Sequence, residues 1–186
     1  MNDSTNYIRK QIELCVWSGF FQPDEVQEMI TDTLEDEADE DFLRALVLPE
    51  FENKKSAERL WPARTDCNRL DEAFEALNAQ GIVALHNAGY TLSDGISDVA
   101  EEIHERGRDA VQGYCFYHFQ DVERAICDEG LTLAFGAMDD DPAEKRRIGE
   151  RVQQAIEAAG FEFEWTGDPE RRIQIPNFDW KWRTAE

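Results

Sequence analysis

Side chains able to bind ligands or transfer protons follow two short apolar runs of this sequence. His86 and Asn87 come directly after the run 82–85, and His118 stands near the end of the run 114–119. If these runs are parallel strands, their carboxyl ends meet at one edge of the sheet, where open α/β proteins bind ligands. A histidine beside a carboxylate can act as a general base or hold a metal. The candidate ligand-binding residues at this edge are His86, Asn87, Tyr90, Asp94, His118 and Asp121.

The spacing of these residues does not define a reaction. Histidines at strand ends also serve as helix caps or bind backbone carbonyls. The sequence contains none of the G-x-G-x-x-G, G-x-x-x-x-G-K-[ST], G-x-S-x-G or H-E-x-x-H motifs. Cys67 lies in the first turn of a predicted helix, which favours a thiolate, but no base is identifiable near it. The catalytic residues are therefore unknown, and we expect no metal site and no cofactor.

Alternating helices and strands would position this edge. Glycines end several of the helices, and Asp141-Pro142 gives a strong helix start, with an acidic N-cap followed by proline. The runs 82–85, 114–119 and 131–135 read as buried strands, whereas 161–165 and 172–175 alternate like a half-exposed hairpin. These patterns predict an α/β fold: a mixed sheet of about five strands with helices on both faces and an edge hairpin. An α+β arrangement is the alternative.

The first third of the chain reads as helices. An apolar stripe runs from Ile8 to Val16 and Gly19 ends it, while Pro23 opens a second helix. Pro49 interrupts a third apolar patch, and residues 50–64 read as a connector. We therefore expect a helical N-terminal segment, 1–60, packed on an α/β domain, 61–186.

An acidic run dominates this N-terminal part. Residues 24–41 contain ten Asp and Glu and no Lys or Arg, in a chain with a net charge of −22. Within this range, the run 35–41 is either a solvated, frayed helix end or a contact for a basic partner, and we favour the solvated interpretation. The overall charge argues against nucleic acid and against an anionic membrane as partners, because both require clustered Lys and Arg.

The remaining composition indicates a cytoplasmic protein. The N-terminal residues lack the apolar run of a secretory signal, and no stretch is long enough to cross a bilayer. The four cysteines are far apart and form no C-x-x-C pair, which is typical of reduced thiols. The oligomeric state stays open.

Several stretches resemble an uncharacterised bacterial family known only as a domain of unknown function. The resemblance covers roughly Trp61 to Trp182 and implies a fold unit but no reaction. Some members carry cysteines after the first strand; the NAGY sequence found here at 87–90 has none, so the resemblance implies no metal role for this chain. The matching stretches are 65–71 (TDCNRLD), 81–90 (GIVALHNAGY), 93–95 (SDG), 113–121 (GYCFYHFQD) and 133–136 (LAFG).

Two functions remain open at this stage. The first is a non-catalytic binding or regulatory protein whose acidic surface contacts a basic protein, with an association that weakens in salt. The second is a small enzyme or ligand-binding domain that uses the histidines at the strand ends. The second hypothesis requires His86, His118 and either Asp94 or Asp121 to converge on an open pocket.

Overall fold

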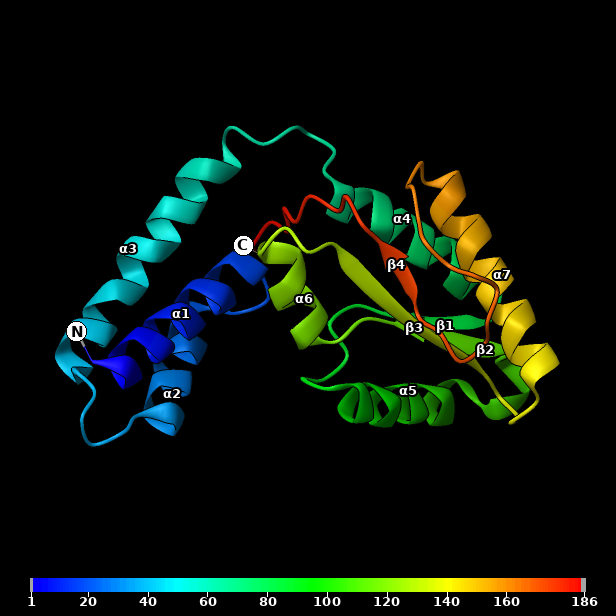
Figure 1. Ribbon diagram of the computed structural model, residues 1–186, viewed down its shortest axis with the longest axis horizontal. Coiled ribbons are helices and arrows are strands. Elements are labelled where there is room, and N and C mark those ends of the chain that lie inside the picture. Colours follow the sequence, from blue (N-terminus) through cyan, green and yellow to red (C-terminus); the bar gives the residue numbers. More distant parts are fainter. Residues whose placement is uncertain (1, 185–186) are drawn as a thin grey trace. The chain divides into compact units, whose positions relative to one another are not determined.

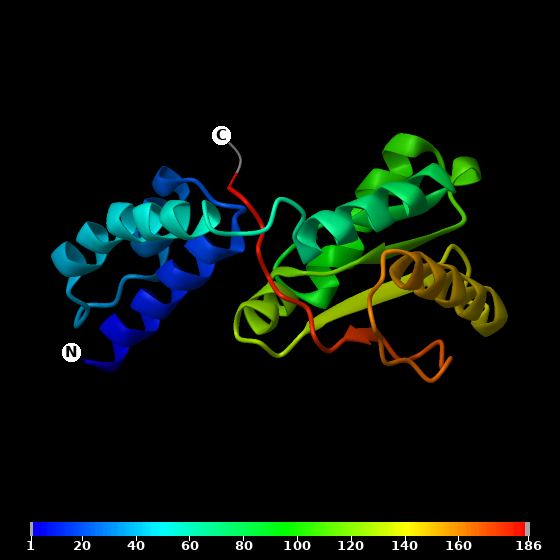
Figure 2. The same ribbon diagram turned by 90° about the horizontal axis from the view of Figure 1, so that it is seen from above.

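The computed structural model describes residues 2–184, which form two compact units (Figures 1 and 2). The first unit comprises the described residues of Met1–Thr65 and of Lys181–Glu186, and the second is Asp66–Trp180. The described residues form seven α-helices and a four-stranded mixed sheet. The predicted α/β class is therefore confirmed, and the N-terminal part of the described chain is helical.

Local capping signals set the helices of the first unit. Helix α1 (Asp3–Ser18) begins where the Asn2 side chain accepts from Thr5 N at 2.8 Å, and it ends at Gly19, whose φ of 86° suits glycine. Helix α2 (Pro23–Thr33) has its proline at the first position. Their apolar stripes form a buried core with that of α3 (Glu40–Glu58), which includes Leu43 and Val47.

Helix α3 continues through Pro49, which the sequence suggested as a break. Proline removes one helical hydrogen bond, the one to the carbonyl of Ala45. Both Ala45 and Pro49 lie on the exposed side of the helix, so water can satisfy that carbonyl. The buried Leu43 and Val47 hold the helix on the core, and the connector that follows is consequently shorter than predicted, beginning at Arg59.

Residues 181–184 belong to the first unit. Thr184 Oγ1 accepts from the Lys54 ammonium at 2.6 Å, and the ring of Trp182 lies 5.0 Å from that of Phe20. The Lys54 side chain is only 1% exposed and pairs with Glu58 at 3.1 Å. Because burying an ammonium is costly without hydrogen-bond acceptors, these contacts stabilise this end of α3.

The second unit is built on a sheet of order β1-β2-β3-β4. β1 (Ile82–Leu85) and β2 (Gly113–Phe116) are parallel, whereas β3 (Leu131–Ala137) is antiparallel to β2 and to β4 (Ile173–Ile175). The intervening elements are α4 (Asp66–Ala79), α5 (Leu92–Arg106), a short 3₁₀ helix (Arg108–Ala110), α6 (Phe119–Ile126) and α7 (Pro142–Ala158).

Helices cover the two faces of the sheet, as predicted (Figure 1). On one face α7 packs so closely on β2 that a Cβ on Gly113 would lie 2.7 Å from the Ile148 side chain. On the other face α5 approaches β2 through Gly95, where a Cβ would lie 2.2 Å from the Phe116 ring. This close approach buries Val99 and Phe116 in one cluster with Ala88 and Ala134.

The sheet has four strands, and the prediction of about five was wrong. Residues 161–165 are not a strand: Glu164 forms a single isolated bridge with Gln174. Trp165 instead turns inward, packs edge-on against Phe135 and donates from Nε1 to the carbonyls of Asp168 and Arg171 at 3.0 Å. The predicted edge hairpin is thus reduced to one bridge. Among the first three strands only β1 and β2 are parallel, so only these two bring their carboxyl ends to the same edge.

Candidate functional site

His86 stands at the end of β1, in a hydrogen-bonded chain that we call the His86 network (Asp71, His86 and Tyr117). Its Nδ1 lies 2.9 Å from Tyr117 Oη, and its Nε2 lies 3.1 Å from Asp71 Oδ1. The imidazole stacks on the Phe74 ring of α4 at 4.6 Å. Burial lowers the pKa of His86, against the opposing effect of the Asp71 carboxylate. The ring is therefore neutral near pH 7.

Tyr117 forms the inner end of this network. Its side chain is completely buried, burial raises its pKa well above the ordinary value, and its ring packs edge-on against Trp180. An Asp-His-Tyr chain can relay a proton in principle. The phenol has no solvent exposure, whereas the Asp71 side chain at the other end of the network is 51% exposed. The network connects the ends of β1 and β2 to α4.

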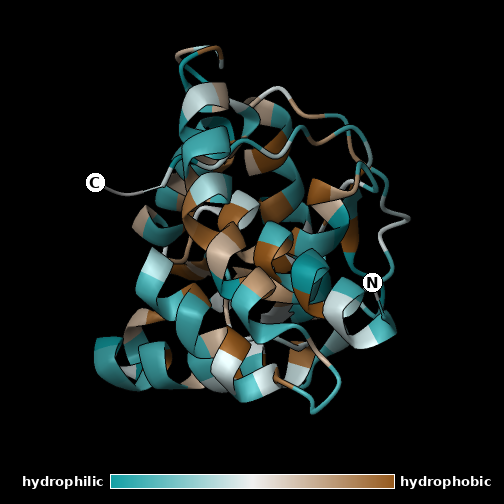
Figure 3. Cartoon of the chain, turned by 90° about the vertical axis from the view of Figure 1, so that its left-hand side faces the viewer, coloured by the Kyte–Doolittle hydropathy of each residue, from teal (hydrophilic) through white to brown (hydrophobic). Residues whose placement is uncertain are grey.

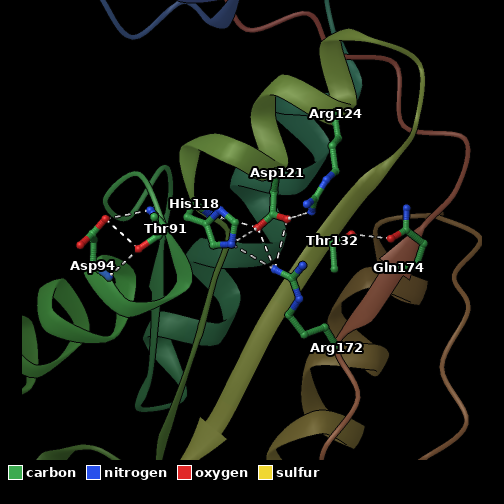
Figure 4. Close-up of polar contacts among 8 residues, drawn as sticks. All are labelled: Thr91, Asp94, His118, Asp121, Arg124, Thr132, Arg172 and Gln174. Carbon is green, nitrogen blue, oxygen red and sulfur yellow. Dashed lines mark hydrogen bonds and ion pairs between the residues drawn. The ribbon is translucent and has the colours of Figure 1, made fainter.

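His118 and Asp121 meet at the start of α6, in the Asp121 cluster (His118, Asp121, Arg124 and Arg172; Figure 4). The Asp121 carboxylate is fully buried and lies 3.2 Å from His118 Nε2. It accepts from Arg172 Nη1 at 3.0 and 3.1 Å and from Arg124 Nη1 at 3.2 Å. The backbone N–H of His118 adds a fifth contact at 3.3 Å. These donors compensate the desolvation of the carboxylate.

The protonation of His118 follows from these contacts. Burial has the largest effect on the pKa of His118 and lowers it. The Asp121 carboxylate raises this pKa, whereas Arg172 and Arg124 lower it further. Nε2 lies 3.2 Å from Asp121 Oδ2, which can only accept, and 3.3 Å from Arg172 Nη1, which can only donate, so its role depends on the tautomer. Nδ1 is buried and has no hydrogen-bond partner among the described residues. The residue as a whole is only 3% exposed.

The other candidates have separate local roles. Asp94 caps α5, accepting at Oδ2 from the backbone N and the Oγ1 of Thr91, both at 2.9 Å, and these hydrogen bonds lower its pKa. Asn87 takes a left-handed conformation with φ 50°, and its Oδ1 is buried without a partner among the described residues. Tyr90 is 47% exposed, with its ring 6.0 Å from that of Phe119.

The structure brings His118 and Asp121 together and gives His86 a different set of partners. The loops that carry them are joined through the backbone, with Ala88 N donating to Tyr117 O at 2.9 Å and Phe119 N to Gly89 O at 3.0 Å. Four residues of the two clusters were not predicted: Asp71, Tyr117, Arg124 and Arg172. Only Arg124 carries a local signal, because it stands three residues after Asp121 on one helix.

A second candidate surface is the acidic segment, residues 24–41. All ten of its Asp and Glu residues are exposed. Within the described part of the chain, one of them forms an ion pair, Glu40 with Arg44 at 2.7 Å. Figure 3 shows hydrophilic (teal) and hydrophobic (brown) residues alternating along the helices that face the viewer. The segment is therefore a region of largely uncompensated negative charge.

Hydrogen bonds to α1 hold the loop between α2 and α3 in place. Asp39 N donates to Thr5 Oγ1 at 3.0 Å, Ser4 Oγ donates to the Glu35 carboxylate, and the Asn2 side chain donates to the carbonyl of Glu37. Asp39 also caps α3 by accepting from Phe42 N at 3.1 Å. The acidic run is thus not a frayed helix end: α2 stops at Thr33, and the run continues through an anchored loop into α3.

The fold and these sites define a two-unit α/β protein with buried polar clusters and an exposed acidic segment. The chain belongs to the family described as domain of unknown function DUF6891, whose family model matches residues 1–184. The predicted membership in an uncharacterised family is therefore confirmed, and the match includes the helical first unit. No curated protein and no solved structure matches the chain. No helix within residues 2–184 is long and apolar enough to cross a membrane.

Proposed function

We propose that this protein is a non-catalytic, cytoplasmic binding protein whose acidic segment contacts a basic surface of another protein. The carrying observation is that ten carboxylates are exposed along residues 24–41 and only Glu40 has a cationic partner among the described residues. Complementary charge accelerates association and selects the partner, with an attraction that salt screens. Nucleic acids and anionic membranes would be repelled.

The anchoring of the loop supports a contact surface over a merely solvated one. Hydrogen bonds with Asn2 and Thr5 hold the backbone of this loop, and Ser4 holds the Glu35 carboxylate, before a partner arrives. Preorganisation of this kind reduces the entropy lost on binding. The anchored loop therefore favours the interpretation of the acidic run as a contact for a basic partner over its interpretation as a solvated segment.

The histidines support a role without catalysis. His86 is engaged at both ring nitrogens, and its partner Tyr117 is fully buried. His118 is almost fully buried and lies against Asp121. The pocket shared by both histidines, which the enzyme hypothesis requires, has no support in these contacts. Cys115 and Cys127 form no disulfide, which supports the cytoplasmic location.

The test is a binding titration with a fluorescently labelled oligolysine peptide as the basic probe. The quadruple variant E35Q/E37Q/D39N/D41N removes four charges, while the asparagine that replaces Asp39 can still cap α3. The matched control D98N/E101Q/E105Q/E157Q removes four exposed charges from α5 and α7. We expect the first variant to weaken binding by at least about tenfold at low salt and the control by less than about threefold. Equal losses in both variants would reject the acidic segment as the contact surface.

A further inference from the structure

A cleft on the α5 side of the sheet combines positive charge with exposed apolar side chains. Its volume is about 220 Å³, and it opens between the start of α5, strands β2 and β3, and the turn before β4. Six of its lining residues matter here: Leu92, Ile96, Tyr114, Lys145, Arg171 and Arg172.

The positive charge of this cleft contrasts with the unit around it. Asp66–Trp180 contains 25 Asp and Glu and ten Lys and Arg. Three of the ten basic residues line the cleft, together with a single acid, Glu170, which Lys145 holds at 2.8 Å. An anion would therefore find a local cationic site on an otherwise acidic surface.

Arg172 is the fixed element of this site. Only Nη1 of its guanidinium contacts Asp121 and His118, as Figure 4 shows. Nε and Nη2 have no hydrogen-bond partner among the described residues, and the side chain is 31% exposed. A guanidinium held by a buried carboxylate loses little further freedom when its remaining donors bind a ligand. Its planar fork matches a carboxylate.

The apolar part of the cleft comes from α5 and β2. Leu92 is 46% exposed and Ile96 is 42% exposed, although both stand on a helix that packs on the sheet. The Tyr114 ring lies over Gly136, where a Cβ would come within 2.3 Å of the phenol oxygen. A ligand tail placed here would remove exposed apolar surface from water, which stabilises the complex.

We propose that this cleft binds a small organic carboxylate that carries an apolar tail. The carboxylate lies between Arg172, Lys145 and Arg171, and the tail lies against Leu92 and Ile96. The site is separate from the acidic segment and does not depend on the function proposed for that segment.

The test is a titration of the full-length, ¹⁵N-labelled chain with octanoate, followed by amide chemical shifts. We expect saturable shifts in the amides of Leu92, Ile96 and Arg171. Leu92→Asp adds a repelling charge at the first position of α5, where an acid suits the helix, and should weaken binding by at least about tenfold. Arg171→Gln should weaken it by about three- to tenfold. Leu60→Asp, at a position that is 87% exposed and outside the cleft, is the matched control and should change nothing.

Three results would overturn the proposal. The first is the absence of saturable shifts at millimolar octanoate. The second is equally strong binding of octanamide or of acetate, because the cleft requires both the charge and the tail. The third is an equal loss in Leu92→Asp and in the control. Variants at Arg171 and Leu92 leave the buried Asp121 cluster intact, so a loss of binding would not report misfolding.

Discussion

The contact between Arg172 and Asp121 is the interaction in the second unit whose loss should cost most. Arg172→Met keeps an unbranched apolar side chain but removes the donor that lies 3.0 and 3.1 Å from the two carboxylate oxygens. Removing one partner of a buried ion pair costs about 3–5 kcal/mol. Arg124 still contacts the carboxylate, so we expect the lower end, about 3 kcal/mol in the free energy of unfolding.

Urea unfolding at pH 7, followed by tryptophan fluorescence, measures this loss. Arg147→Met is the matched control, because Arg147 pairs with Glu144 at the surface and exposed pairs contribute about 0–1 kcal/mol. Asp121→Asn removes the other charge and completes a double-mutant cycle. The free energy of unfolding of D121N/R172M should be higher, by at least about 1.5 kcal/mol, than the value obtained by adding the losses of the two single variants. An additive cycle, or a loss in Arg172→Met no larger than in the control, would refute the role of Asp121 as a carboxylate that depends on Arg172.

Three further predictions follow from single contacts. Burial lowers the pKa of His86 and of His118 below the ordinary 6.5, so both histidines take up protons when the protein unfolds below that pH. Their contribution to the free energy of unfolding is therefore complete above pH 6.5 and is lost as the pH falls below it. The midpoint of urea unfolding should decrease when the pH is lowered from about 7.5 to about 5.8, and it should decrease less in the variant H86Q/H118Q. Gly95→Ala should lower the free energy of unfolding by about 1–3 kcal/mol despite the better helix propensity of alanine, because its Cβ would overlap the Phe116 ring. Calorimetry measures this loss, with a Ser→Ala substitution at an exposed serine of α5 as the control. Thr184→Val should reduce stability by about 1.5–3 kcal/mol, because the buried ammonium of Lys54 loses an acceptor at 2.6 Å. The loss should appear as faster amide hydrogen exchange in α3.

Local signals made most of the helices predictable. Gly19 and Pro23 mark an end and a start in the sequence, and the structure places helix boundaries there. Asp141 is the N-cap of α7, as its position before Pro142 indicated. These signals act within one turn of the chain, so no distant residue changes them.

The strands and the Asp121 cluster depended on contacts that a single sequence does not display. An alternating stretch such as 161–165 fits a strand and also fits an extended segment whose tryptophan folds inward. The direction of β3 depends on its pairing with β2, which the apolar run does not encode. Arg172 reaches Asp121 across 51 positions, and no spacing rule connects them.

The most direct test of the acidic segment as a contact surface is a map of amide chemical shifts when a decalysine peptide is added to the ¹⁵N-labelled full-length chain at low salt. We predict shifts concentrated in residues 24–41, lost when the salt is raised well above 0.15 M, where the screening length falls below about 8 Å. Shifts spread evenly over the exposed acids of α5 and α7, or none within the segment, would contradict the proposed function.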